Sequence, residues 1–282
     1  MSGIVVVDKP AGWTSHDVVA RVRRLAGTRR VGHAGTLDPM ATGVLVIGIE
    51  RATRLLGHLA LHDKEYLATI RLGVTTTTDD ADGELVAQAP VDVSDAAVAS
   101  AMSALVGDLM QVPSSVSAIK VDGERAYSLV RKGIDVALAA RPVHVARFDV
   151  LARRGDDLDV HVSCSTGTYV RALARDLGVA LGVGAHLTSL RRTRVGGFDL
   201  SMAQGVDGPL TTVSLDEAVN ASFPRRDLTD DEVYRVARGQ AIAPVGCEPG
   251  AVGAFGPDGS VVALIEERDG RVRSLAVFAP AG

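Results

Sequence analysis

The chain has 282 residues, of which 46% are hydrophobic, and a formal net charge of −4 at pH 7. This length predicts one large domain followed by a small one, and the hydrophobic share is ample for a sizeable core. A disulfide framework and a zinc site are excluded because Cys164 and Cys247 lack the necessary spacing. Because the sequence has neither a signal-peptide pattern nor an apolar run of membrane-spanning length, we expect a soluble, cytoplasmic protein.

Strands and helices are expected to alternate through the first part of the chain. We expect strands at residues 4–7, 44–47, 66–72 and 158–164. We expect helices at residues 52–61, 94–107 and 168–181. A further helix begins at Thr14 or Ser15, since either residue can serve as the N-cap, has Leu25 on its apolar face, and ends at Gly27.

The residues that follow about position 225 are expected to form a separate small unit. A polar join at 220–227 leads to Thr229 and Glu232, which have the spacing of a capping box at the start of a short helix. Short strands with glycine-rich turns follow. Residues 226–282 carry 6 basic and 9 acidic side chains, which argues against strong contact with RNA there.

One acidic side chain lies in a segment that breaks regular structure. Asp38 belongs to the stretch GHAGTLDPMATG at 32–43, in which Gly32, Gly35 and Pro39 disfavour helix and strand. The apolar run at 44–47 would anchor this loop. A carboxylate on a loop held against a rigid core is a common arrangement for a catalytic group. An aspartate that caps a turn is the alternative, and it is the commoner role of an isolated Asp-Pro pair.

Several separated segments resemble one known family when they are taken together and in order. The segments are IVVVDKPAGWTS at 4–15, residues 32–48, residues 64–83, residues 113–131, CSTGTYVR at 164–171 and residues 184–192. They resemble the signature of the bacterial tRNA pseudouridine-55 synthases, the TruB family. The resemblance covers nearly the whole first domain.

The resemblance implies a mixed α/β (α+β) fold in two domains. The pseudouridine synthase catalytic domain would span residues 1–225, with a central, largely antiparallel sheet and a thumb-like segment at 112–142 that clasps RNA. A small PUA-like β domain would follow at 226–282. Both boundaries are expectations from the sequence.

The activity implied by the resemblance is isomerisation of the T-loop uridine, position 55 of tRNA, to pseudouridine. The base is flipped out of the stack, the N1–C1′ bond is cleaved, and the base is rejoined through C5. The reaction has no redox change, so we expect no cofactor. The absence of a Walker motif and of GxGxxG from the sequence agrees with this expectation.

Three residues would carry the chemistry by this resemblance. Asp38 would either add to C1′ or stabilise charge there while a proton leaves C2′, and the sequence does not choose between these routes. Arg171 would be the counter-ion that keeps Asp38 ionised in a dry pocket. Tyr66 would stack on the flipped uracil and take a proton. Without the motifs, Arg171 would be interpreted as a helix-surface residue and Tyr66 as a core residue.

Contacts to the substrate follow from the same resemblance. Tyr169 would line the pocket, Leu190 would pack against the base, and His33 would occupy the space that the flipped base leaves in the T-loop. Lys120 is a candidate phosphate or pocket-ordering contact, with a surface lysine as the alternative. Asp80 is a candidate RNA contact, although an aspartate within a turn is the commoner interpretation.

We expect no metal site. The stretch Asp80 to Gly83 hints at a calcium loop, but Thr78 and Ala89 stand where acidic ligands would be required.

The expected partner is tRNA, bound through its T-arm stem-loop, with no guide RNA and no membrane, by a monomeric protein. Two clusters of arginines are candidate phosphate contacts, although solvated helix faces are an equally good interpretation of each. They are Arg21, Arg23, Arg24, Arg29 and Arg30, and Arg171, Arg175, Arg191, Arg192 and Arg194. The alternative function is a tRNA-folding module that opens and re-anneals the tRNA elbow without essential chemistry.

Overall fold

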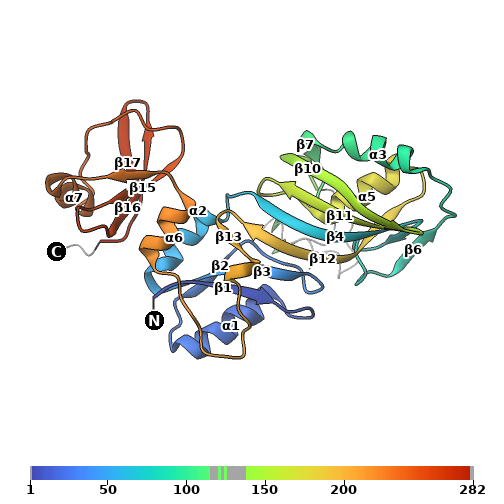
Figure 1. Ribbon diagram of the computed structural model, residues 1–282, viewed down its shortest axis with the longest axis horizontal. Helices are drawn as coiled ribbons and strands as arrows, with labels where there is room; N and C mark the ends of the chain where they lie inside the picture. The colour runs from blue at the N-terminus through green and yellow to red at the C-terminus, as the bar shows by residue number, and fades with distance from the viewer. Residues whose placement is uncertain (1, 115–119, 122–123, 126–137, 280–282) are drawn as a thin grey trace.

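The computed structural model describes residues 2–114, 120–121, 124–125 and 138–279. Its larger part is built on a nine-stranded sheet, and its C-terminal part on a four-stranded sheet (Figure 1). Most of the expected thumb-like segment at 112–142, including the side chain of Lys120, lies outside the described residues.

The central sheet has the strand order β1-β3-β12-β4-β11-β10-β7, with β2 paired to β3 and β13 paired to β12. Its strands are β1 (Gly3–Lys9), β2 (Val31–Ala34), β3 (Thr42–Ile49), β4 (Lys64–Leu72), β7 (Gly107–Gln111), β10 (Arg141–Arg154), β11 (Asp157–Cys164), β12 (Ala185–Val195) and β13 (Phe198–Asp199). Neighbouring strands pair antiparallel, except that β3 and β12 meet in parallel where Gly43 lies opposite Arg192. The predicted mixed fold with a largely antiparallel central sheet is confirmed.

The helices and the small hairpins connect these strands. The helical segments of the larger part are α1 (Ser15–Ala26), the 3₁₀ helix η1 (Glu50–Leu55), α2 (Leu56–Leu59), α3 (Asp95–Ser103), α5 (Val170–Ala180), the 3₁₀ helix η2 (Leu200–Met202) and α6 (Leu215–Ser222). The two-stranded sheets are β5 (Val74–Thr76) with β6 (Leu85–Gln88), and β8 (Lys120–Val121) with β9 (Glu124–Arg125).

The helix expected at 52–61 is mostly not an α-helix, so that prediction is wrong in type. Its first part is the 3₁₀ helix η1, and only the four residues of α2 are α-helical. A 3₁₀ helix places residues i and i+3 on one face, and here it buries both Ala52 and Leu55 completely. The tighter winding therefore suits the packing of this short connection.

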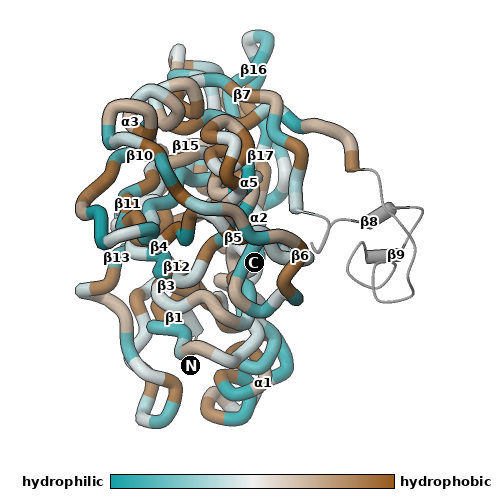
Figure 2. Tube along the Cα trace, turned by 90° about the vertical axis from the view of Figure 1, so that its right-hand side faces the viewer, coloured by the Kyte–Doolittle hydropathy of each residue, from teal (hydrophilic) through white to brown (hydrophobic). Residues whose placement is uncertain are grey.

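The ends of α1 are formed by the residues that the sequence suggested. Thr14 is the N-cap and shares a capping box with Asp17, and Gly27 closes the helix in the left-handed conformation, with φ 63°. Leu25, expected on the apolar face, is 37% exposed, so that detail is wrong. Figure 2 shows hydrophilic residues along much of α1.

The central sheet is covered by apolar side chains on both faces. Alternate residues of β1 enter different clusters, because Val5 and Val7 pack with α1, α3 and α5, whereas Ile4 and Val6 pack with α2 and α6. Burial on both faces explains why β1 and β3 are continuous apolar runs rather than alternating ones.

The C-terminal unit packs against the same face as α2 and α6. It consists of β14 (Arg225–Asp227), α7 (Asp230–Ala237), β15 (Ala251–Phe255), β16 (Val261–Arg268) and β17 (Arg271–Val277). Phe255 and Phe278 share one apolar cluster with Val219 of α6 and Ile4 of β1. Figure 1 shows α2 and α6 between the two sheets. The two parts are therefore joined by shared core packing.

Candidate active site

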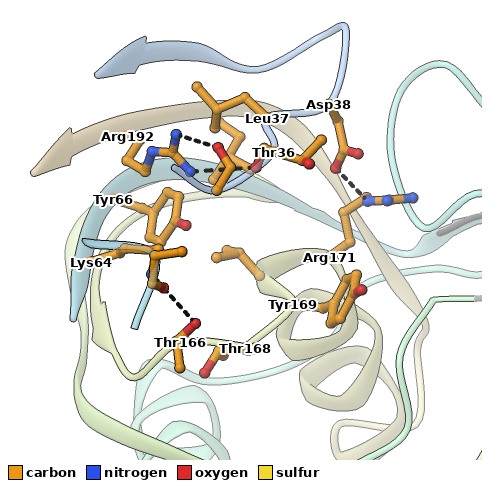
Figure 3. A pocket seen from close by; sticks show the side chains of 15 residues that line it. Thr36, Leu37, Asp38, Lys64, Tyr66, Thr166, Thr168, Tyr169, Arg171 and Arg192 are labelled. Atoms are coloured by element: carbon orange, nitrogen blue, oxygen red, sulfur yellow. Dashed lines mark hydrogen bonds and ion pairs between the residues drawn. The ribbon is translucent and has the colours of Figure 1, made fainter. Parts of the chain in front are cut away.

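A cavity of about 260 Å³ lies where the loop after β2 meets β4, β12 and the start of α5 (Figure 3). Its lining residues come from distant parts of the sequence. They are Gly35, Thr36, Leu37, Asp38, Ala60, Lys64, Tyr66, Thr166, Gly167, Thr168, Tyr169, Val170, Arg171, Leu190 and Arg192. Five of the sequence-predicted site residues are therefore brought together: Asp38, Tyr66, Tyr169, Arg171 and Leu190.

Asp38 and Arg171 form an ion pair on one side of the cavity. Arg171 Nε lies 3.0 Å from Asp38 Oδ2, and the Arg171 side chain is 5% exposed whereas that of Asp38 is 37% exposed. Arg171 Nη1 lies 3.4 Å from Asp80 Oδ2 and donates a hydrogen bond of 2.9 Å to the carbonyl of Thr78. One buried guanidinium thus contacts two carboxylates, of which only Asp38 has substantial access to solvent.

The charge state of Asp38 depends on Arg171. Burial raises the pKa of the Asp38 carboxyl above its usual value, and the nearby charge of Asp80 adds to the rise. Arg171 is the strongest opposing influence, and Lys9 opposes the rise more weakly. The guanidinium therefore favours the ionised carboxylate in a place where burial alone would favour the acid.

The loop that carries Asp38 has every backbone carbonyl from 35 to 39 hydrogen-bonded. Side chains from outside the loop supply most of the donors. The pairs are Arg192 Nη2 to Gly35 O (3.0 Å), Arg192 Nη1 to Thr36 O (3.4 Å), Ser15 Oγ to Leu37 O (3.1 Å), Ala41 N to Asp38 O (3.1 Å), and both Gly12 N (2.8 Å) and Lys9 Nζ (3.2 Å) to Pro39 O. The loop is irregular in conformation, but each of these carbonyls has a donor, which restricts the position of Asp38.

The expected extent of this loop was partly wrong. Gly32 was expected to disfavour a strand, but it lies inside β2, opposite Gly48 of β3. A Cβ atom at Gly32 would lie 3.0 Å from Leu56, so a small residue here permits close packing rather than a turn.

Two buried cations beneath the loop were not identified from the sequence. Arg192 is 1% exposed and also donates to the carbonyl of Val44 at 2.7 Å. Lys9 is fully buried and donates to the carbonyl of Trp13 at 2.6 Å. Burial is the main cause that lowers the pKa of Lys9 to about 8. The sequence signal for Lys9 is its place at the end of an apolar strand, whereas Arg192 stands among the five arginines of the second cluster and nothing nearby in the sequence distinguishes it.

The opposite side of the cavity is formed by β4. Tyr66 is 6% exposed, and burial raises the pKa of its phenol, with Arg192 opposing the rise, so the phenol stays protonated at neutral pH. Lys64 Nζ donates to the carbonyls of Ala60 (2.9 Å) and His62 (2.7 Å). Burial, followed by the neighbouring charge of Arg192, lowers the pKa of Lys64 to about 8.

Tyr169 and Leu190 complete the cavity. Tyr169 is the N-cap residue of α5, and the side-chain amide of Gln111 accepts a hydrogen bond from its backbone nitrogen (2.8 Å) and donates one to its carbonyl (3.2 Å). Leu190 lies on β12 and is 7% exposed. The structure thus presents an apolar and aromatic surface opposite the carboxylate of Asp38 (Figure 3).

Asp80 and His33 lie outside the cavity lining. Asp80 is 4% exposed, and its carboxylate faces Arg171 and accepts a hydrogen bond from the backbone nitrogen of Asp82 at 3.1 Å. It therefore lies behind Arg171 and not on a surface open to RNA, contrary to the expected direct contact. His33 lies on β2 with its ring 5.7 Å from that of His16, and burial lowers its pKa.

The second arginine cluster is not a free basic patch, so that expectation is wrong. Besides Arg171 and Arg192, its members pair with carboxylates. The pairs are Arg175 with Asp79 (3.5 Å) and Asp176 (2.8 Å), Arg191 with Asp8 (2.8 Å), and Arg194 with Glu65 (2.6 Å). The first cluster is more open to solvent, because Arg23, Arg24, Arg29 and Arg30 are exposed. Two of its members also lie near carboxylates, Arg21 at 3.7 Å from Asp207 and Arg30 at 3.9 Å from Glu50.

Two classes of site find no support in the part of the chain that the structure describes. No group of three or more histidine, cysteine, aspartate or glutamate side chains there could hold a metal ion. None of the helices described is long and apolar enough to cross a membrane.

Comparisons with known proteins agree with this geometry. A model described as the TruB family pseudouridylate synthase N-terminal domain matches residues 23–170. Models described as the tRNA pseudouridylate synthase B C-terminal domain and as tRNA pseudouridine synthase II, C terminal, match residues 171–208 and 223–279. The chain is similar along almost its whole length to proteins named tRNA pseudouridine synthase B. Identity is 59% to that of Mycobacterium sp. (strain KMS), covering 99% of this chain and 97% of the relative, and 57% to that of Thermobifida fusca (strain YX), covering 98% of each.

Solved structures extend the likeness. One described as a Cbf5-Nop10-Gar1 complex superposes with a TM-score of 0.78 and 27% identity, covering 99% of this chain and 85% of the other. A second, of an H/ACA RNP bound to a substrate RNA containing 2′-deoxyuridine, has a TM-score of 0.75 and 26% identity, covering 99% and 86%. On this combined basis of sequence, domain matches and fold, the chain belongs to the TruB family of pseudouridylate synthases.

Proposed function

We propose that this isomerase converts the T-loop uridine of tRNA, position 55, to pseudouridine, with Asp38 as the catalytic carboxylate. The names of the full-length relatives support tRNA as the substrate. The observation that carries the role of Asp38 is its position: a partly accessible carboxylate, paired with a buried arginine, at the edge of a cavity lined by Tyr66, Tyr169 and Leu190.

The proposed reaction needs the target base outside the RNA stack. The flipped uracil would stack on Tyr66 and lie against Leu190, because aromatic and apolar side chains are the usual receivers of an extruded base. The protonated phenol of Tyr66 favours stacking over the proton-accepting role that the resemblance also suggested. His33 would contact the T-loop outside the cavity.

The chemistry breaks one bond and forms another without a net change of oxidation state. The N1–C1′ bond is cleaved, the base turns, C5 bonds to C1′, and the proton on C5 is lost while N1 gains one. Ionised Asp38 either adds to C1′ and leaves again when C5 bonds there, or stabilises positive charge at C1′ while the C2′ proton passes to a base and returns as C5 bonds to C1′. Arg171 holds the carboxylate in its charged form for either route, and no electron acceptor is required.

The test measures tritium release from 5-tritiated uridine in a minimal T-arm hairpin. Wild type should release tritium, and Asp38→Asn should lose at least about 10³-fold in rate while still binding the hairpin, because the variant keeps the shape but not the charge. Release by both proteins would refute the role of Asp38. Release by neither, with tight binding of the hairpin by both, would favour a tRNA-folding module or another RNA target.

A tRNA-folding role is the second candidate function. It is favoured by the exposed arginines Arg23, Arg24, Arg29 and Arg30, which lie on α1 or in the turn after it and outside the cavity, where they can contact phosphates independently of Asp38. If this role is separate, Asp38→Asn should accelerate refolding of unmodified tRNA as well as wild type does. Loss of both activities in Asp38→Asn would count against it.

A further inference from the structure

The hydroxyl of Ser15 makes two hydrogen bonds to the residue that precedes Asp38. Ser15 Oγ donates to the carbonyl of Leu37 at 3.1 Å and accepts from its backbone nitrogen at 2.9 Å. Ser15 is 1% exposed and Leu37 is 4% exposed, so water cannot readily replace either bond. Both backbone polar groups of Leu37 therefore depend on a single side chain.

The helix that carries Ser15 does not need this hydroxyl for its own stability. Thr14 is the N-cap, and its side-chain hydroxyl accepts a hydrogen bond from the backbone nitrogen of Asp17 at 3.1 Å. In return, the Asp17 carboxylate accepts a hydrogen bond from the backbone nitrogen of Thr14 at 2.8 Å. Because Thr14 and Asp17 form the cap, the hydroxyl of Ser15, the next residue, is available to bond to the loop that carries Asp38. Helix α1 is thus joined to the catalytic loop by a contact that is separable from its cap.

Leu37 is held at three points, which restricts where Asp38 can lie. Its two backbone groups bind Ser15, and its side chain belongs to the main apolar cluster together with Val18 and Val19 of α1. The next residue, Asp38, must place its carboxylate 3.0 Å from Arg171 Nε, on the same side of the cavity. A shift of Leu37 is passed directly to that distance.

We propose that Ser15 is a positioning residue for the reaction, and that its hydroxyl anchors Leu37 so that the Asp38 carboxylate meets Arg171. This inference depends on the proposed catalytic role of Asp38. Ser15 does not touch the cavity, so it acts through the backbone of the loop and not on the substrate.

Replacing Ser15 by alanine removes both bonds and leaves the nitrogen and carbonyl of Leu37 buried without partners. The loop is then expected to relax by a fraction of an ångström, which in a catalytic arrangement costs about 10- to 100-fold in rate. We expect Ser15→Ala to lower kcat by about that factor. We also expect its Kd for the T-arm hairpin to stay within about twofold of wild type, because the bases and phosphates are bound by other residues.

The pH dependence of kcat supplies a readout that a general loss of stability would not change. Arg171, Asp80 and Lys9 are the charged groups that influence Asp38, and Arg171 is the strongest of those that favour its ionised form. If the Asp38–Arg171 distance grows in Ser15→Ala, the pKa of Asp38 rises and the acid limb of the profile moves to higher pH. If Ser15 is merely structural, the limb stays where it is in wild type.

Thr14→Ala is the matched control, because it weakens the same helix without touching Leu37. Ser15→Cys is the conservative variant, since a thiol occupies the same place with weaker hydrogen bonds, and it should recover part of the lost rate. The experiment compares kcat, hairpin Kd and the acid limb for wild type, Thr14→Ala, Ser15→Ala, Ser15→Cys and Asp38→Asn, each first checked for folding by circular dichroism.

The proposal predicts a slow Ser15→Ala with a shifted acid limb, beside a Thr14→Ala that resembles wild type. It is overturned if Ser15→Ala keeps wild-type kcat while Asp38→Asn is inactive, or if Thr14→Ala and Ser15→Ala lose rate equally with unmoved limbs. If Ser15→Ala does not fold, Ser15→Cys decides the question by the same two measurements. An active Asp38→Asn would instead refute the proposed function on which this inference depends.

Discussion

The two sides of the cavity hold their buried cations in different ways. On one side, Arg171 lies between the carboxylates of Asp38 and Asp80. On the other, Arg192 and Lys64 donate to backbone carbonyls. Both arrangements satisfy buried donors, but only the first neutralises charge.

The two kinds of contact have different consequences for the site. An arginine between carboxylates controls which of them is ionised, so its loss changes the charge of the reacting group. A cation bound to carbonyls fixes backbone positions but keeps its charge uncompensated, which is why burial lowers the pKa of Lys64 to about 8. We therefore expect substitutions on the first side to affect the rate most, and those on the second to affect stability.

The largest effect is expected for Arg171→Met. Loss of the guanidinium leaves the buried carboxylate of Asp80 and the partly exposed one of Asp38 without their counter-charge, which should cost about 3 kcal/mol in the free energy of unfolding. The rate should fall by about 10³-fold because Asp38 then favours its protonated form. Single-turnover isomerisation and urea unfolding measure the two effects. A stable Arg171→Met with wild-type rate would remove the distinction between the two sides.

A smaller effect, confined to stability, is expected for Gly43→Ala on the second side. Gly43 has φ 101°, and a Cβ atom there would lie 2.1 Å from the carbonyl oxygen of Arg192, at the parallel junction of β3 and β12. We expect a loss of about 3 kcal/mol, measured as a lower Tm.

Gly12→Ala is the control for that experiment. Gly12 has φ 79°, but a Cβ atom there would meet nothing within 4 Å, so only the backbone conformation is penalised, at about 1 kcal/mol. Equal losses of Tm in the two variants would show that close packing at the β3–β12 junction contributes little.

The smallest effect concerns Lys64 and pH. Folding lowers the pKa of this amine from 10.5 to about 8. Below about pH 8 the amine is charged in both states, and its burial destabilises the folded protein by the full amount. As the pH rises from 8 toward 10.5, the amine becomes neutral in the folded protein only, so the free energy of unfolding increases. Relative to Lys64→Met, wild type should gain about 2 kcal/mol between pH 7.5 and pH 10. Urea unfolding of both proteins at the two pH values measures the gain. A pH-independent difference would mean that the amine is charged equally in both states.

Local patterns in the sequence predicted a large part of this molecule. The apolar runs at 4–7 and 44–47, the helix that ends at Gly27, and the capping box at Thr229 all appear in the structure, because each depends on residues within one or two turns. Asp38, Tyr66, Tyr169, Arg171 and Leu190 were placed in one site by resemblance, and they do line one cavity. Their roles in catalysis stay predictions.

Other features could not be predicted because they depend on contacts between distant segments. Asp80 has the sequence of a turn, and only the packing of α5 turns its carboxylate inward to Arg171. In the sequence, nothing distinguishes Arg192 from the other arginines of its cluster. The register of β12 against β3 places it beneath the loop that carries Asp38.

Thr14 and Ser15 were equivalent candidates for one cap. The tertiary structure assigned Thr14 to the helix and Ser15 to Leu37. The sequence by itself determined the apolar strands at 4–7 and 44–47, the end of α1 at Gly27 and the presence of a carboxylate on a loop, because hydrophobic period and backbone preference act locally. Which donor satisfies each buried carbonyl around that carboxylate was decided only when the sheet assembled, since the partners of a buried polar group depend on strand register and not on nearby sequence.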